Sequence, residues 1–292
     1  MNNPNIHRIL VPVDFSPTGE SAIEYGAYLA NLFNAKLFLL HVLEDAPKYP
    51  HEWQDSRNSA ITKGRLRENA TNKLIEYTRN VKLKYTIGVE YLLTEGKPSH
   101  KITETVSEYD IDLIVMGTHG ASGFEELFIG SNAHKVANLS PCPVITIREG
   151  FHIPGLKTIV LPIDDSLHSR QKVNNVIPIA KKCNSVIHLL GLTHTNSKSE
   201  IAKLHIKMKS MEEMAKKAGV TCVSKIINGD NLAMETMGYA EEVNAEMLAI
   251  MTDHESTMSG SFMGAFAQQI VNHSTLPVLS IKPIKSYYEY AL

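Results

Sequence analysis

The sequence has little cysteine, no strong charge of either sign and no long apolar run, and each shortage excludes a class of protein. Three isolated cysteines among 292 residues argue against a disulfide framework or a cysteine-based zinc site, and they fit a reducing compartment. A net charge of −2 argues against a general electrostatic hold on nucleic acid or an anionic membrane. Since no run of about 18 apolar residues occurs, we expect no transmembrane helix. The stretch "MNNPNIHRILVPVDF" does not resemble a signal peptide, so we expect a cytoplasmic protein.

Several well-known nucleotide and catalytic motifs are also missing. No G-x-x-x-x-G-K-[ST] occurs, which excludes a Walker-type loop with its phosphate-binding lysine. No G-x-G-x-x-G follows the first apolar run, which argues against a dinucleotide-binding fold. No H-E-x-x-H metal motif and no G-x-S-x-G nucleophile elbow occurs at a strand–helix turn. Fast catalysis is therefore not indicated.

The chain contains two copies of one unit, which decides its architecture. Ungapped alignments join residues 7–43 to 157–193 and residues 138–147 to 272–281. Between them, "LIVMGTHG" at 113–120 aligns with "LAIMTDHE" at 248–255. Glycine and proline in "REGFHIPGLK" break the pattern between the copies. We therefore expect two domains, residues 1–150 and 151–292.

Each copy alternates short apolar runs with segments of helical spacing. This order predicts a parallel sheet covered by helices on both faces, hence an α/β fold. In such sheets ligands bind at the carboxyl ends of the strands. In the first copy the pattern predicts strands at 9–13, 36–42, 88–93, 113–116 and 143–147, and helices near 17–33, 58–81, 96–109 and 131–139.

A glycine-rich stretch follows the strand predicted at 113–116 and ends at a predicted helix. Gly117, Gly120 and Gly130 would let the backbone approach a ligand closely, and Ser131 adds a hydroxyl donor. The N-terminus of a helix offers free N–H groups and a partial positive charge, which suit phosphate. The stretch is therefore typical of a phosphate cradle built mainly from backbone, although a surface loop with glycine turns would look similar.

The spacing Gly117-x-x-Gly120, then Gly130-Ser131, together with "VPVDFS", Gly96-x-Pro98 and "SPCPVITI", resembles the universal stress protein family. The resemblance covers nearly the whole chain as two tandem domains. It implies, for each domain, a five-stranded parallel sheet of the Rossmann-like type shared with adenine nucleotide alpha hydrolases. It also implies ATP, with Mg²⁺ or Mn²⁺ on its phosphates, and a role in stress response or regulation.

The resemblance also implies site residues and a domain pairing. The final strands, Pro143–Ile147 and Pro277–Ile281, would pair, so that one chain forms its own pseudo-dimer; a homodimer of chains stays possible. The residues expected to hold the nucleotide are Pro12, Val13, Asp14, Val42, Met116, Gly117, His119, Gly120, Gly130, Ser131 and Asn132.

The second copy departs from this pattern. The sequence alignment puts Thr252 opposite Gly117, Glu255 opposite Gly120 and Ala265 opposite Ser131, with a loop one residue shorter. A bulkier, negatively charged residue beside a triphosphate is unfavourable. We therefore expect the second copy to bind ATP weakly or not at all.

Two alternatives remain open at this point. His119 beside the phosphates could support slow ATP hydrolysis or nucleotidyl transfer. The second domain could instead serve as a scaffold or carrier for a non-nucleotide ligand or a metal ion. Histidine and aspartate side chains at three strand ends could bind such an ion, or they could simply form the polar rim of an empty crevice. The candidate metal ligands follow three predicted strands and are Asp165, His168, His194, Asp253 and His254.

Overall fold

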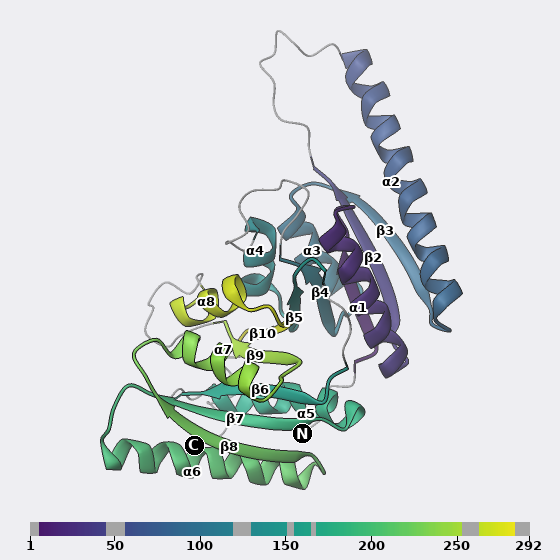
Figure 1. The fold of residues 1–292 in the computed structure, drawn as a ribbon. Helices are drawn as coiled ribbons and strands as arrows, with labels where there is room; N and C mark the ends of the chain where they lie inside the picture. Colours follow the sequence, from purple (N-terminus) through teal and green to yellow (C-terminus); the bar gives the residue numbers. More distant parts are fainter. Residues whose placement is uncertain are drawn as a thin grey trace.

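The computed structural model describes residues 6–44, 56–118, 130–150, 155–164, 168–252 and 263–283. Strands and helices alternate in each half of the chain, as the sequence predicts (Figure 1). The first half contains β1 (Arg8–Pro12), α1 (Pro17–Phe33), β2 (Lys36–Leu43), α2 (Ser56–Lys84), β3 (Val89–Glu95), α3 (Pro98–Glu108), β4 (Leu113–Gly117), α4 (Ser131–Leu139) and β5 (Val144–Ile147). The second half contains β6 (Thr158–Ile163), α5 (Ser169–Cys183), β7 (Val186–Thr193), α6 (Lys198–Lys217), β8 (Thr221–Asn228), α7 (Leu232–Glu242), β9 (Met247–Met251), α8 (Ala265–His273) and β10 (Val278–Ile281).

Local chemistry explains where the first helix of each half begins or ends. Ser16 caps the N-terminus of α1 by accepting from the Gly19 N–H at 3.1 Å, and Pro17 supplies the fixed φ suited to the first helical position. Asn34 ends α1 with a left-handed backbone, φ 55°, and Asn184 ends α5 in the same way, φ 53°. Asparagine tolerates this conformation better than most residues, so both turns into the next strand are defined by sequence.

All ten described strands form one sheet, in the order β3-β2-β1-β4-β5-β10-β9-β6-β7-β8. Each half contributes five strands, and all pairings within a half are parallel. The halves join where β5 and β10 pair antiparallel, with Leu279 opposite Ile145. These are the final strands whose pairing the family resemblance implies.

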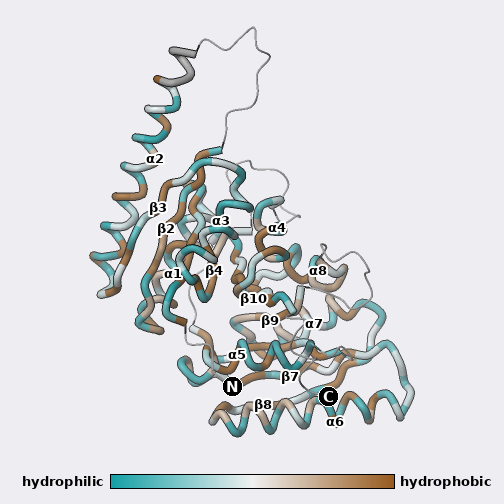
Figure 2. Tube along the Cα trace, turned by 180° about the vertical axis from the view of Figure 1, so that it is seen from behind, coloured by the Kyte–Doolittle hydropathy of each residue, from teal (hydrophilic) through white to brown (hydrophobic). Residues whose placement is uncertain are grey.

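Helices cover both faces of this sheet, and the strands are rich in apolar residues (Figure 2). One face has a continuous buried core that runs through both halves and includes Leu29 of α1, Ile145 of β5 and Val176 of α5. The other face carries two separate clusters: one lies in the first half, and the other lies in the second half together with Ala137 of α4. No helix in the described ranges is long and apolar enough to cross a membrane.

Hydrogen bonds at the ends of β4 and β9 correct the alignment of the two copies. The N–H of Thr118 donates to the Ile147 carbonyl at 2.8 Å, and the N–H of Thr252 donates to the equivalent Ile281 carbonyl at 3.0 Å. The carbonyls of Thr118 and Thr252 accept from Gly130 and Gly264 in turn. Thr252 therefore corresponds to Thr118, and the expectation that it replaces Gly117 is wrong.

This one-residue shift changes which residues differ between the copies. Met251, not Thr252, occupies the place of Gly117, because the two residues pair with Ile281 and Ile147 respectively. The loops that follow have equal length rather than differing by one residue. Counting along the chain then puts His254, not Glu255, opposite Gly120. The error arose because both strands are uniformly apolar, so that sequence matching alone did not set their register.

Candidate functional site

The carboxyl ends of β1, β2 and β4 meet at one edge of the sheet, because β1 pairs with both of its neighbours. A cavity of about 490 Å³ opens at this edge, and we call it the first-domain cavity. All expected nucleotide-binding residues within the described ranges line it, namely Pro12, Val13, Asp14, Val42, Met116, Gly117, Gly130, Ser131 and Asn132. His119 and Gly120 lie outside the described residues.

The carboxylate of Asp14 is held by the start of α1. Its Oδ1 accepts from the Ser16 N–H at 3.1 Å and from the Ser16 hydroxyl at 2.6 Å. A Cβ at Gly19 would lie 2.7 Å from the same oxygen, so only glycine leaves room for this arrangement. The sequence predicts Asp14 but not the part played by Gly19, which also lines the cavity.

The opposite wall of the first-domain cavity is the beginning of α4. Gly130 precedes the helix, and its N–H donates to the Thr118 carbonyl at 2.6 Å. No side chain caps this end of α4 in the described part of the chain. Ser131 is exposed and Asn132 is half-buried, both at the cavity. The first N–H groups of α4 and the Ser131 hydroxyl therefore form a donor set that suits an anion.

His41 is a cavity residue that sequence reasoning missed. Its Nδ1 lies 2.6 Å from the Val13 carbonyl, which can only accept, so Nδ1 carries the proton. Burial lowers the pKa of His41, and the neutral ring is favoured. The Phe15 ring centroid is 4.3 Å away, and Phe15 has a left-handed backbone, φ 62°, which is uncommon for a bulky residue. The position of His41 directly before Val42 was the available signal.

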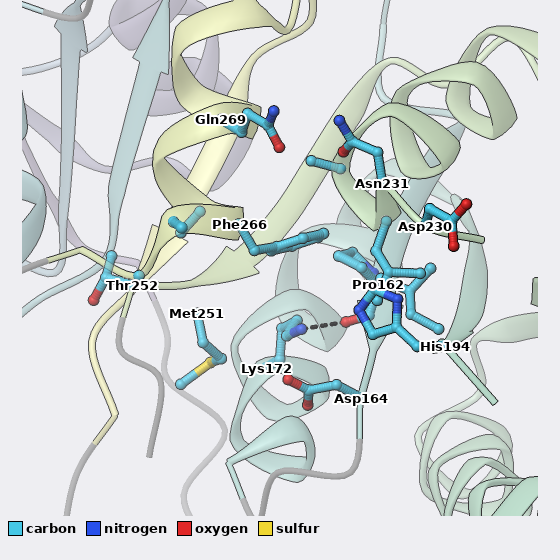
Figure 3. Close-up of a pocket in the computed structure, with 16 residues that line it drawn as sticks. Pro162, Asp164, Lys172, His194, Asp230, Asn231, Met251, Thr252, Phe266 and Gln269 are labelled. Atoms are coloured by element: carbon cyan, nitrogen blue, oxygen red, sulfur yellow. Dashed lines mark hydrogen bonds between the residues drawn. The ribbon is translucent and has the colours of Figure 1, made fainter. Parts of the chain in front are cut away.

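A second cavity, of about 410 Å³, lies at the equivalent edge of the second half (Figure 3). We call it the second-domain cavity. Asp164 lines it in the place of Asp14, and Gly264 in the place of Gly130. Other positions differ in size or charge: Lys172 replaces Ala22, Met251 replaces Gly117, Ala265 replaces Ser131 and Phe266 replaces Asn132.

The described residues do not assemble the candidate metal site. Among them, no group of three or more histidine, cysteine, aspartate or glutamate side chains could hold an ion. His194 lines the second-domain cavity, where its Nδ1 lies 2.8 Å from the Gly229 carbonyl. His168 precedes α5 and does not line this cavity. The remaining candidates, Asp165, Asp253 and His254, lie outside the described residues.

The three cysteines are free thiols in buried or partly buried positions. Burial raises the pKa of Cys142 and of Cys183 to about 11. The thiolate, which is the nucleophilic and metal-binding form, is therefore disfavoured at both.

Comparison with known proteins agrees with this architecture. The sequence model described as the universal stress protein family matches residues 5–148 and again residues 155–282. Universal stress protein YxiE of Bacillus subtilis is 29% identical over 152 residues, which cover 49% of this chain and 99% of that protein. Universal stress protein A homolog 1 of Coxiella burnetii is 30% identical over 144 residues, which cover 48% of this chain and 94% of that protein.

Similarity to solved structures extends over both halves. The crystal structure of a universal stress protein from Archaeoglobus fulgidus superposes with a TM-score of 0.76 over 98% of this chain and 100% of that one, at 19% sequence identity. This likeness shows a common fold. Because the family model matches twice and covers nearly the whole chain, the protein belongs to the universal stress protein family, with two family domains in tandem.

Proposed function

We propose that this protein is an ATP-binding stress-response regulator whose nucleotide is held in the first domain. The observation that carries the proposal is the first-domain cavity. Nine residues that the family resemblance implies for nucleotide binding line one cavity of about 490 Å³ at the carboxyl edge of a parallel sheet. That is the edge where open α/β sheets bind ligands, and the size fits a nucleotide.

The lining residues suggest a specific division of labour. The carboxylate of Asp14, fixed by Ser16, can accept hydrogen bonds from ribose hydroxyls. Backbone groups of Val13 and Val42 flank the adenine side of the cavity. The start of α4, with Ser131, donates to the phosphates. A Mg²⁺ or Mn²⁺ ion bound to phosphate oxygens would neutralise the charge that remains there.

The two halves of one chain complete the family pairing in this proposal. β5 and β10 join the domains edge to edge, so the chain acts as its own pseudo-dimer. ATP occupancy in the first domain would then reach the second through a shared sheet and a continuous core.

The proposal is tested by placing a negative charge at the start of α4. In Gly130→Asp the backbone, φ −57° and ψ 144°, accepts a side chain, and aspartate is a good helix cap. The new carboxylate would repel the phosphates, so ATP affinity should fall by about tenfold or more in equilibrium titration. The matched control is Gly264→Asp at the start of α8, which has nearly the same backbone, φ −58° and ψ 151°.

The control separates the two domains. Wild type and Gly264→Asp should each bind one ATP per chain with equal affinity. Equal ATP affinity in Gly130→Asp and wild type would contradict a phosphate site at α4. Loss of ATP affinity in Gly264→Asp alone would indicate that the nucleotide binds in the second domain instead.

A further inference from the structure

The second-domain cavity contains a lysine that the nucleotide site lacks. Lys172 lies in the first turn of α5, and only 4% of the residue is exposed. Its ammonium group donates to the carbonyl of Pro162, as Figure 3 shows. In the first domain the equivalent residue is Ala22, which is fully buried. Lysine is seldom buried unless it is paired or has a function, so this substitution requires an explanation.

The charge on Lys172 is only partly compensated inside the protein. Burial lowers the pKa of Lys172 to about 8, although the nearby Asp164 carboxylate acts in the opposite direction. The depressed pKa means that the desolvation of the ammonium outweighs its attraction to Asp164. An ammonium has three N–H donors, and the Pro162 carbonyl takes one of them. A negatively charged ligand in the cavity would therefore stabilise the protonated lysine.

Part of the wall around this ammonium is apolar. Leu192, Leu232, Ala267 and the ring of Phe266 line the cavity. In Figure 3 the Phe266 ring lies between Lys172 and the amide side chain of Gln269. A site with a buried cation beside an apolar wall fits a ligand that has one charged end and an apolar body.

Two helices begin at the same cavity. The first residues of α7 and of α8 both line it, and the partial positive charge of each N-terminus favours an anion. The Asn231 side chain caps α7 by accepting from the Met234 N–H at 3.2 Å. Asp230 also lines the cavity, but it is an exposed residue at the rim.

The same residues disfavour a nucleotide. Met251 stands where Gly117 allows close approach, and the ring of Phe266 stands in the place of the Asn132 amide. Ala265 lacks the hydroxyl of Ser131. A triphosphate would lose a hydrogen-bond donor here and would meet larger side chains.

We propose that the second-domain cavity binds a small monocarboxylic acid with an apolar or aromatic body, whose carboxylate pairs with Lys172 and whose body packs against Phe266. This proposal does not depend on ATP binding by the first domain. A carboxylate would use the ammonium donors in a dry setting, where charge-assisted hydrogen bonds are strong.

The test is calorimetric titration of the full chain with phenylacetate, benzoate and octanoate. We expect at least one acid to bind at one site per chain with a Kd of about 1 mM or tighter. Lys172→Met keeps an apolar stem of similar length and removes the charge, so affinity should fall about tenfold or more. Lys203→Met removes the same charge from an exposed position on α6 and should leave affinity unchanged. Phenylacetamide, the neutral analogue, should bind much more weakly than phenylacetate.

Several results would overturn the proposal. Equal affinity of wild type and Lys172→Met for phenylacetate would show that Lys172 does not bind the carboxylate, which contradicts the proposal. Equal affinity for phenylacetamide and phenylacetate would contradict it as well, because the charge of the ligand would then not matter. No binding of any of the three acids would also end it, and displacement of phenylacetate by ATP would assign the cavity to nucleotide. A second variant, Phe266→Asn, introduces the residue found at this position in the first domain. It should lower the affinity for the aromatic acids, because the ring contacts are lost. The far-ultraviolet circular dichroism spectrum checks that the variant is folded.

Discussion

The two aspartates that follow the first strand of each half are held in different ways. In the first domain Asp14 faces Gly19, where even a Cβ would lie 2.7 Å from Oδ1. In the second domain the position of Gly19 is taken by Ser169, whose hydroxyl donates to Asp164 Oδ1 at 3.1 Å. Both aspartates therefore accept from a nearby serine hydroxyl, Ser16 for Asp14 and Ser169 for Asp164. They differ in that the space beside Asp14 is kept open by a glycine.

Gly19→Ala is expected to reduce ATP binding without unfolding the protein. The added methyl group would displace the Asp14 carboxylate and lower ATP affinity about tenfold, the usual effect of losing one good hydrogen bond to a charged group. Stability should change little, since alanine is the better helix former. Equilibrium ATP titration and thermal unfolding measure the two effects.

Gly64→Ala is the matched control for this prediction. Gly64 is exposed in α2, and nothing lies within 4 Å of a Cβ built there. This variant should keep full ATP affinity and gain about 1 kcal/mol of stability from helix propensity. If Gly19→Ala bound ATP as wild type does, Asp14 would not depend on the space at Gly19.

Two cavity residues that the sequence did not predict, His41 and Lys172, depend on groups outside their own strand or helix. Asp14, Gly130 and Ser131 could be predicted because they follow strands or begin a helix. His41 is defined by its bond to the Val13 carbonyl, and its place directly before Val42 was its one local signal. Lys172 is defined by its burial, which leaves no local pattern. Only the repeat itself could have exposed Lys172, since alignment places it opposite the apolar Ala22.

At the scale of elements, each half has a carboxylate that accepts hydrogen bonds from the backbone at the start of its first strand. The carboxylate lies just before the neighbouring strand of the sheet. Asp112, just before β4, accepts from the His7 N–H at 2.7 Å and from the Arg8 N–H at 2.9 Å. Glu246, just before β9, accepts in the same way from Lys157 and Thr158. The repeat therefore retains the interaction while changing the residue.

Asp112→Ala should lower the free energy of unfolding by about 1–2 kcal/mol, because two backbone donors at the start of β1 lose a charged acceptor. Urea denaturation measures the change. The control is Asp110→Asn, which breaks the exposed ion pair with Arg8 but keeps a residue that tolerates φ 47°. That variant should change stability by less than about 0.5 kcal/mol. Equal effects of the two substitutions would show that Asp112 acts only as a surface charge.

Elements were predicted well from sequence, whereas the register of one element was not. Strand and helix types follow from apolar spacing, and the predicted bounds of α4 agree with the structure residue for residue. The placement of β9 slipped by one residue because apolar side chains fill both of its faces. Backbone bonds such as that from Thr252 to Ile281 fix the register, and the sequence does not contain them.

At the scale of the whole molecule, the join between β5 and β10 makes one sheet out of two repeats. The four residues of β5 and the four of β10 are all buried. Because the core on one face also runs through both halves, we infer that the domains unfold together rather than separately. Which strands meet was expected from the resemblance to the family, and apolar edge strands are consistent with such pairing. The sequence could not show that their side chains would be fully covered.

The join between β5 and β10 can be tested at Ser280, a buried polar residue of β10. Ser280 is 1% exposed in β10, opposite Val144 of β5, and its hydroxyl has no hydrogen-bond partner among the described residues. Its counterpart Thr146 donates to the Val278 carbonyl at 3.4 Å.

Ser280→Ala removes an unpaired buried hydroxyl, so the free energy of unfolding should rise by about 1 kcal/mol. Because the join belongs to both halves, scanning calorimetry should show one transition that moves upward as a whole. Ser224→Ala, on the exposed edge strand β8, should move it by much less. A lower midpoint for Ser280→Ala would mean that the hydroxyl is bonded in solution, and two separate transitions would mean that the halves unfold independently.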